Sequence, residues 1–410
     1  MIEDNKKTGS PIFFQLLSLI PKHIIKESVA EHKSDHYYKT MTTEKQLYLL
    51  LYAVISKSLS ISSLLKSFCL FGRKIICLGF NKNPAKSTFS DANRNRDSKV
   101  FASIYFALVK HYQKRLSHSY LRLMLNGEIA VDKVKIFDAT IITLFTDVFK
   151  ACGRIPHEGK RKGGEKQQTL IDLASKVPEV VVLGDASKND KDFIGQLTVT
   201  KGNFYVFDKG YVNYNVWLLW TKKEAWFVTR LNENANYKTI EIKYADSYEN
   251  LGVNIVSEST IVLKTAKERD LKLRKIVYKD PIKGRLLTFI SNNFEVKPST
   301  ICSLYKSRWE IEVFFKQLKQ NFNLSSFLSD SRFGIESQTW SVLIANLLFT
   351  VLHKRIEEAV DFIVMVSVAR LNLVSYVSIE SYLKKKMPVG EERNLENVQL
   401  SLFNQKVGTG

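Results

Sequence analysis

The stretch LYKSRWEIEVFFKQLKQ, residues 304–320, carries apolar and charged side chains at the spacing of an amphipathic helix. At about 100° per residue, four polar side chains fall within an arc of about 60°: Tyr305, Arg308, Glu312 and Lys319. The apolar arc beside them holds Ile311, Phe314, Phe315 and Leu318. Because the polar stripe adjoins the apolar one, we predict a helix that lines a cleft. Surface ion pairs between residues four apart are the alternative interpretation.

Two aspartates stand where strands are expected. Asp138 follows the run KVKIF, and Asp208 follows YVF and precedes Lys209-Gly210-Tyr211. A carboxylate in an apolar strand is costly unless it is paired or bound to a metal ion. Either aspartate alone would more often be a turn or cap residue. Together with Glu312 they predict a set of hard oxygen ligands, as metal-dependent phosphoryl transfer requires.

The segments around these residues predict a mixed α/β architecture. Residues 127–231 are rich in β-branched side chains and predict strands, among them 204–208 and 225–231, with a helix over 212–224. Residues 232–285 predict a β-rich insertion, in which nine basic and three acidic residues lie between Lys264 and Arg285. We interpret this segment as a basic rim, with a solvated surface hairpin as the alternative. Helices are predicted over 298–322 and 338–358, within a second core segment that spans 286–375. Residues 376–410 are predicted to form a loose tail.

Residues 1–126 predict an almost wholly helical domain. Thr43-Glu44-Lys45-Gln46 opens an apolar run with the pattern of a capping box. A helix over 59–71 and a second helix from residue 87, which carries Arg94 and Arg96, have the outline of a helix-turn-helix DNA reader. An ordinary helical bundle fits the same pattern.

The charge balance points to a polyanionic partner. The chain of 410 residues holds 61 Lys and Arg against 41 Asp and Glu, a net charge of +20. Nucleic acid is the commonest partner of such a protein, although non-specific adhesion would also fit. The four cysteines are scattered without metal-ligand spacing, which predicts reduced thiols. The start lacks the order of a secretory signal, and the apolar runs 11–20, 47–55 and 340–352 are shorter than a membrane span. We therefore expect a cytoplasmic protein without membrane contact.

The helix also carries a recognisable signature. Tyr305-x-x-Arg308-x-x-x-Glu312-x(6)-Lys319 resembles the Tyr-Arg-Glu-Lys signature of a group of bacterial insertion-sequence transposases of the DDE class. Asp138-Ala139-Thr140 and Asp208-x-Gly210-Tyr211 are similar to the two aspartate motifs of that group, although Ser or Thr more often follows the first aspartate. Lys162-Gly163-Gly164-x-Lys166 and residues 227–231 also match, so the resemblance covers nearly the whole chain.

The resemblance implies an RNase H-like catalytic core, a mixed sheet flanked by helices. A β-rich insertion would lie between the second aspartate and the glutamate, after an all-helical N-terminal DNA-binding domain. It implies a DNA transposase that binds terminal inverted repeats, cuts the ends and joins them to target DNA as a nucleoid-associated homodimer on double-stranded DNA. Asp138, Asp208 and Glu312 would coordinate two Mg²⁺ or Mn²⁺ ions.

The DNA contacts that the resemblance implies form two sets. Phosphates would be bound by Tyr305, Arg308, Lys319, Lys162 and Lys166. The basic segments and the resemblance together predict further DNA contacts. These would come from Arg94, Arg96, Arg154, His157, Lys160, Arg161 and Arg230.

Relatives in the group cleave DNA by forming a hairpin on the transposon end. An aromatic residue of their insertion domain holds a flipped base. This chain has no Trp between Asn232 and Arg308, which leaves as candidates Tyr237, Tyr244, Tyr248, Tyr278 and Phe289. Two other functions remain open on the sequence alone. One is a catalytically silent or domesticated DNA-binding protein, and the other is a stand-alone nuclease of the same fold.

Overall fold

A computed structural model gives the fold of the chain. It describes residues 10–117, 123–143, 164–185, 190–244, 254–265, 269–324, 326–357 and 360–386. Five predicted DNA-contact residues lie outside these ranges: Arg154, His157, Lys160, Arg161 and Lys162. The last 24 residues of the predicted tail, 387–410, also lie outside them, as does the base-stacking candidate Tyr248.

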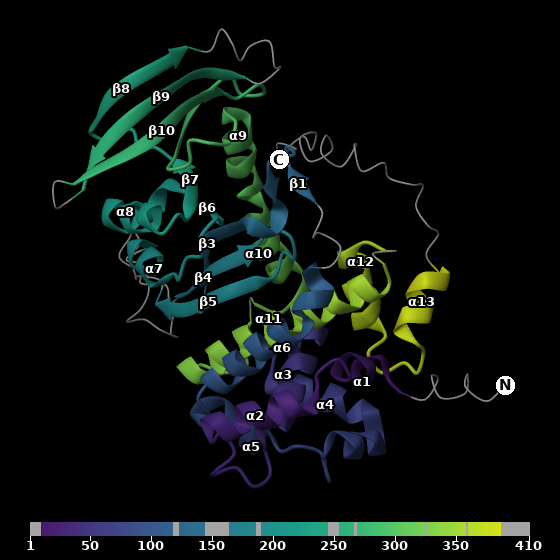
Figure 1. Cartoon of the computed structure of the whole chain (residues 1–410). Helices are drawn as coiled ribbons and strands as arrows, with labels where there is room; N and C mark the ends of the chain where they lie inside the picture. Colours follow the sequence, from purple (N-terminus) through teal and green to yellow (C-terminus); the bar gives the residue numbers. More distant parts are fainter. Residues whose placement is uncertain are drawn as a thin grey trace.

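Residues 12–117 form the helical N-terminal part, drawn from purple to blue in Figure 1. Its elements are α1 (Ile12–Leu17), α2 (Lys22–His32), α3 (Thr43–Ser56), α4 (Ile61–Phe68), the 3-10 helix η2 (Cys69–Leu78), α5 (Lys86–Asn95) and α6 (Lys99–Ser117). Helices α3, α5 and α6 pack against the long helix α11 (Arg332–Arg355) of the C-terminal half. The helical part therefore shares one apolar core with the rest of the molecule.

Two local predictions in this part are wrong. The cap of α3 is Thr42, whose hydroxyl accepts a hydrogen bond from Lys45 N at 3.4 Å, and Thr43 is buried and donates to Asp35. The helix-turn-helix prediction also fails, because α4 and α5 are separated by residues 69–85, most of which are 3-10 helix. A helix-turn-helix reader needs a turn of about three or four residues at that place.

A nine-stranded mixed sheet forms the other half of the molecule. Its strand order is β5-β4-β3-β6-β7-β11-β10-β9-β8. The strands are β3 (Val134–Thr143), β4 (Gly164–Asp172), β5 (Pro178–Asp185), β6 (Phe204–Val206), β7 (Trp226–Arg230), β8 (Tyr237–Tyr244), β9 (Ile255–Lys264), β10 (Asp270–Lys279) and β11 (Leu286–Ser291). Strands β3, β6 and β7 are parallel, and the other pairs are antiparallel.

The β-rich segment expected as an insertion extends this same sheet. Strand β11 pairs with β7 of the core, and β10, β9 and β8 follow outward from it. Figure 1 shows these outer strands as a broad twisted continuation of the central sheet. Within the basic segment, Arg274 is buried and paired with Glu258 at 2.6 Å, so it does not belong to a basic rim. Most of the other described basic residues there are exposed.

Helices cover both faces of the central strands. On one face α7 (Asp190–Gln196) and α8 (Tyr214–Lys222) enclose an aromatic cluster that includes Phe137, Phe207 and Trp217. On the other face lie α9 (Pro298–Ser307), α10 (Trp309–Asn321) and α11, which share a core with Ile136 and Val206. The result is a mixed α/β core flanked by helices, as predicted.

The predicted helix over 298–322 divides at Arg308, which keeps helical dihedral angles between α9 and α10. Helices α12 (Phe362–Leu371) and α13 (Ile379–Lys386) follow α11. By length and composition α11 could cross a membrane, but 89% of its most apolar window is buried inside the protein, as in the core helix of a soluble domain. Compared with the predicted helix over 338–358, α11 begins six residues earlier and ends three residues earlier.

Candidate active site

Asp138, in β3, and Asp208, two residues after the end of the neighbouring parallel strand β6, lie at the same level of the sheet. Strand β3 pairs with β6 through Ile136 and Val206, and each aspartate stands two residues further along its chain. Because side chains alternate between the faces of a strand, Asp138 shares the face of Ile136, while Phe137 enters the aromatic cluster on the other face. The same alternation through Phe207 directs Asp208 to the face that α9 and α10 cover.

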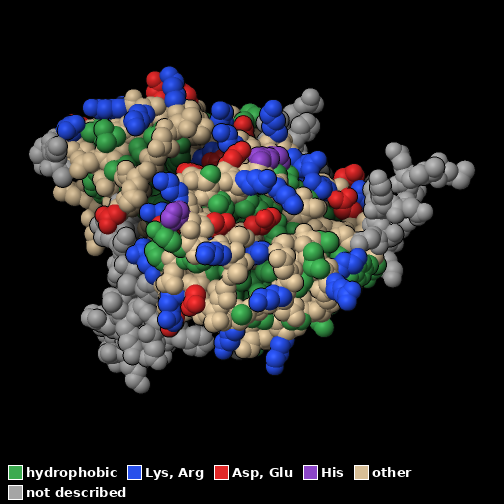
Figure 2. Space-filling model, turned by 90° about the horizontal axis from the view of Figure 1, so that it is seen from below, with side chains coloured by type: hydrophobic (Ala, Val, Ile, Leu, Met, Phe, Trp, Pro, Cys, Tyr) green, Lys and Arg blue, Asp and Glu red, His purple; other side chains and the backbone are tan. Residues whose placement is uncertain are grey.

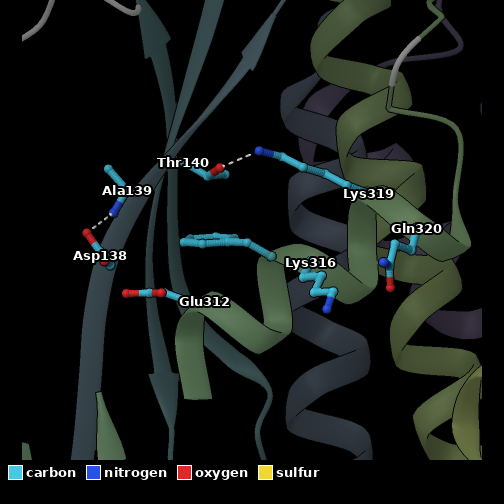
Figure 3. A pocket seen from close by; sticks show the side chains of 8 residues that line it. Asp138, Ala139, Thr140, Glu312, Lys316, Lys319 and Gln320 are labelled. Atoms are coloured by element: carbon cyan, nitrogen blue, oxygen red, sulfur yellow. Dashed lines mark hydrogen bonds between the residues drawn. The ribbon is translucent and has the colours of Figure 1, made fainter. Parts of the chain in front are cut away.

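Glu312 reaches this pair of aspartates from the first turn of α10. In Figure 3 its carboxylate points toward Asp138 across the space between helix and strand. Arg308, one turn earlier, joins the two acids: its Nη1 donates to Asp138 Oδ2 at 3.0 Å and its Nη2 donates to Glu312 Oε1. The guanidinium is largely buried, with 17% of its side chain exposed. Helix α10 and strand β3 are therefore joined by a shared cation.

Tyr305 connects the helix to the second aspartate. Its hydroxyl donates to Asp208 Oδ1 at 3.0 Å, and its ring packs on Phe289 of β11 with centroids 4.7 Å apart. Burial and the Asp208 carboxylate raise the pKa of Tyr305, while Arg308 and Arg230 oppose that rise. The phenol therefore stays protonated and acts as a hydrogen-bond donor at neutral pH.

Lys319 joins the other end of α10 to β3. Its Nζ donates to Thr140 Oγ1 at 2.8 Å and to the Ile141 carbonyl at 3.3 Å. Between Lys319 and Glu312 lies a pocket of about 490 Å³, whose lining includes Asp138, Thr140 and Phe315. Figure 3 shows carboxylates at one end of this pocket and the Lys319 amine at the other. Partial burial lowers the pKa of Lys319.

The Asp138 carboxyl group is affected by its burial and by its neighbours. Burial raises the pKa of Asp138 to about 6, the neighbouring charges of Asp208 and Glu312 add to this rise, and the Ala139 N–H and Arg308 oppose it. Burial makes the charged form of Asp138 costly, and a bound cation would offset that cost. A cation placed among these carboxylates would be stabilised there.

The donor set fits a hard divalent cation. Asp138, Asp208 and Glu312 supply carboxylate oxygens from three different elements, the ligands that Mg²⁺ and Mn²⁺ prefer. Among the described residues, no three acidic or histidine side chains are already arranged to ligate one ion. The contacts explain this, because Arg308 bridges Asp138 and Glu312 while Tyr305 binds Asp208.

Comparison with known protein families shows the family to which the chain belongs. The family model described as "Transposase DDE domain" matches residues 130–348, more than half of the chain, and includes all three carboxylates. The chain belongs to the DDE transposase family. A second model, a domain of unknown function, matches residues 8–81 in the helical N-terminal part of this transposase.

Several individual proteins are similar to this transposase. A putative transposase of Sinorhizobium fredii, y4zB, is 28% identical over 66% of this chain and 72% of its own length. A putative transposase for an insertion sequence element of Synechocystis is 25% identical over 80% of this chain and 87% of its own length. The piggyBac transposase in a synaptic complex with hairpin DNA is 11% identical, with a TM-score of 0.45 over 97% of this chain and 85% of that one.

The other described residues that were predicted to contact DNA differ in their exposure to solvent. Arg96 is 2% exposed and binds groups of the helical part, so the prediction that it contacts DNA is wrong. Lys166 is also buried, within β4 and opposite Ile141, where a surface position was expected. Arg94 is exposed beside Asp330, at 3.7 Å, and Arg230 is half-buried at the end of β7.

The structure also shows how exposed the candidate base-stacking residues are. Tyr278 and Phe289 are 4% and 1% exposed, so neither can stack on a flipped base without rearrangement. Tyr237 is half-buried and lies under Lys275 Nζ at 4.9 Å from the ring centre. Trp309 of α10 is 58% exposed.

Two residues support the site in roles that the sequence did not predict. Thr140 holds the Lys319 amine, and Phe289 supports the ring of Tyr305. The alternation in β3 gives a signal for Thr140, because a residue two positions after Asp138 shares its face. No comparable signal exists for Phe289, since its contact with α9 depends on the order of strands in the sheet.

Proposed function

We propose that this chain is an active transposase that cuts DNA at the ends of a mobile element and joins those ends to target DNA. One observation carries the proposal. Asp138 in β3 and Asp208 just after the adjacent parallel strand β6 stand level, and Glu312 is joined to Asp138 through Arg308 on the same face. A surface cluster of acids would not be built from three elements around a half-buried cleft. The arrangement fits phosphoryl transfer at a polyanionic substrate.

Asp138, Asp208 and Glu312 would hold the divalent ions. When bound, Mg²⁺ or Mn²⁺ would lower the pKa of an attacking hydroxyl and stabilise the departing oxygen. In the proposal, Arg308 releases at least one of its two carboxylate partners before the site is loaded. Its guanidinium is then available for a DNA phosphate, which matches the fork of an arginine as well as a carboxylate does.

The remaining residues of the stripe position the DNA strand. Lys319, at the far end of the pocket from the carboxylates, would act as a point charge on a neighbouring phosphate. The Tyr305 hydroxyl would exchange its bond to Asp208 for a phosphate oxygen. These assignments rest on the resemblance to the Tyr-Arg-Glu-Lys group and on the way α9 and α10 direct the four side chains toward β3 and β6.

The finer steps belong to the same proposal. The protein would recognise the terminal inverted repeats of its own element and act as a homodimer on paired ends. It would cleave the DNA by way of a hairpin intermediate. Among the aromatic candidates, Tyr237 of β8 is half-buried with its ring beneath Lys275, and Tyr278 and Phe289 are buried. If a flipped base is held, Tyr237 is the best placed of these three residues.

Cleavage of the flanking DNA by the Glu312→Gln variant tests the proposal. Duplexes from both sides of the coding sequence are incubated with purified protein and Mg²⁺, and strand breaks are mapped on denaturing gels. We expect wild type to cut at the inverted-repeat boundary and Glu312→Gln to bind the same duplex without cutting it. Glu310→Gln is the matched control, because Glu310 lies on the same helix but pairs with Lys176 at 2.9 Å. Undiminished cutting by Glu312→Gln would refute the assignment.

A further inference from the structure

The turn between β10 and β11, residues 280–285, presents an unusual combination of side chains to solvent. Ile282 is 69% exposed, and Leu286 directly after the turn is 61% exposed. Three exposed cations surround them: Lys279, Lys283 and Arg285. The only acidic residue of the turn, Asp280, has 19% of its side chain exposed. The tip is therefore both apolar and cationic at its surface.

This turn is held in one conformation by its own hydrogen bonds. Asp280 Oδ1 accepts from the backbone N–H groups of Ile282 at 3.0 Å and Lys283 at 3.2 Å. Asp280 N donates to the Arg285 carbonyl at 2.9 Å, and Gly284 N donates to the Asp280 carbonyl at 2.8 Å. Gly284 has a φ of +66°, a conformation that favours glycine.

Asp280 is thus engaged with the turn itself. Slight burial raises the pKa of Asp280, but the two backbone donors and the charges of Arg285 and Lys283 lower it by more. Its carboxylate is therefore ionised at neutral pH. An exposed loop tip does not need such bonding for the stability of the core. The bonding instead fixes the direction in which Ile282 and Lys283 project.

The strand register places the turn on the active-site side of the sheet. Val206 of β6 is level with Val228 of β7, so Asp208 is level with Arg230. Arg230 pairs with Phe289, and β11 continues three residues, roughly 10 Å, beyond that level toward the turn. The turn therefore extends past the same strand ends at which Asp208 stands. Phe289 also contacts Tyr305, which ties this hairpin to the site.

We propose that the β10–β11 turn is a DNA-contacting element, in which Lys279 and Lys283 bind backbone phosphates and Ile282 packs against the bases in a groove. The inference rests on the proposed function and deepens it, since it names a part of the transposase that holds the DNA beyond the cut. Exposed cations around an aliphatic tip complement the two kinds of surface that a groove offers. A protein partner would more often bury a larger apolar area than this tip provides.

The salt dependence of DNA binding tests the two lysines. The probe is a fluorescently labelled duplex of the flanking DNA, and the dissociation constant is measured between 50 and 300 mM KCl. Each phosphate contact contributes about 0.9 to the slope of log K against log salt concentration. We expect Lys279→Ser/Lys283→Ser to reduce the slope by about 2. The control is Lys222→Ser on α8, an exposed lysine on the opposite face of the sheet. An unchanged slope in the double variant would overturn the lysine contacts.

Two further variants test the role of the exposed Ile282 side chain and of the hydrogen-bonded conformation of the turn. Ile282→Ala should weaken binding roughly tenfold, since it removes most of a side chain that DNA would cover. Leu371→Ala, which alters an 83% exposed leucine on α12, is the control. Asp280→Ala removes a negative charge, so attraction by charge alone predicts equal or tighter binding. We instead expect weaker binding, because the turn loses its fixed shape.

The outcomes separate this inference from the proposed function. If wild type neither binds nor cuts the flanking duplex, the proposed function fails and this inference fails with it. If wild type cuts the duplex while the turn variants bind and cut as wild type does, only the inference fails. The Ile282, Lys279 and Lys283 variants should unfold near the wild-type midpoint, since these side chains are exposed.

Discussion

Glu165 is a buried carboxyl group that the catalytic proposal does not use. It lies at the start of β4, is 7% exposed, and accepts a hydrogen bond from Thr339 Oγ1 of α11 at 2.8 Å. Burial raises the pKa of Glu165 to about 8, Glu336 adds to the rise, and Thr339 and Arg332 oppose it. At neutral pH the group is therefore mostly protonated in the folded protein, although it would be ionised in the unfolded chain.

This residue predicts a specific pH dependence of stability. Because the folded pKa is above the unfolded one, the folded state binds more protons between about pH 4.5 and about pH 8. The contribution of Glu165 to stability is full below that window and is lost as the pH rises through it. We expect the midpoint of thermal unfolding of wild type, relative to Glu165→Gln, to fall between pH 5 and pH 8. A constant difference across that range would contradict the assignment.

Arg96 predicts a loss of stability upon substitution. Its guanidinium donates to the Ser34 carbonyl at 3.1 Å, the Met41 carbonyl at 2.7 Å and Asp35 Oδ1 at 3.2 Å, and it stacks over Tyr38. Removing one partner of such a buried network leaves the others unsatisfied. Arg96→Ala should lower the free energy of unfolding in urea by about 3 kcal/mol. Arg94→Ala, at an exposed ion pair, should lower it by less than about 1 kcal/mol. Similar small effects of both substitutions would show that the network is not formed.

At the scale of elements, the C-terminal end of α10 is fixed by cations from other parts of the chain. Arg370 of α12 donates to the carbonyls of Asn321 in α10 and Ile55 in α3, and Lys57 donates to the Gln320 carbonyl. These carbonyls are among the last of their helices and have no partner within the helix. The positive charges also oppose the negative end of each helix dipole. The helix that bears Glu312 is thus anchored partly by the domain of unknown function.

This anchor predicts the effect of removing the guanidinium. Arg370→Met keeps an unbranched side chain as far as the position of Nε and removes the donors, so two partly buried carbonyls lose their partner. We expect the free energy of unfolding to fall by about 3 kcal/mol, and Arg370→Lys to restore part of it. Chemical denaturation followed by circular dichroism measures both values. Equal stability of Arg370→Met and wild type would mean that water replaces the guanidinium at both helix ends.

The elements also show how far the sequence could predict the site. The stripe from Tyr305 to Lys319 was predictable, because helical periodicity is local and Arg308 does not interrupt it. The burial of Arg96 and Lys166 was not, because it depends on partners such as Ser34 and Ile141 that are distant in sequence. The helix-turn-helix prediction failed for a related reason. The pattern of residues 59–96 specifies two helices but not the packing of the segment between them.

At the scale of the whole molecule, the mixed α/β core was predictable and its sheet order was not. Strand β3 pairs with β6 although some 60 residues separate them, and β7 pairs with β11 across the whole of β8, β9 and β10. Alternation along β3, and along the extended chain that leaves β6, places Asp138 and Asp208 on one face only when that order is known. The chain carries a net charge of +20, and Figure 2 shows Lys and Arg side chains scattered over one face with acidic groups among them.

In the proposed function, the three carboxylates of this transposase drive phosphoryl transfer on DNA. Joining of a pre-cut end to a target tests it most directly, because that step needs the site but no prior cleavage. A labelled duplex that ends at the inverted repeat is incubated with supercoiled plasmid and Mg²⁺, and joined products are counted by gel electrophoresis. We predict joining by wild type, none in EDTA and none with Asp208→Asn. Joining by Asp208→Asn at the wild-type rate, or joining in EDTA, would contradict the account.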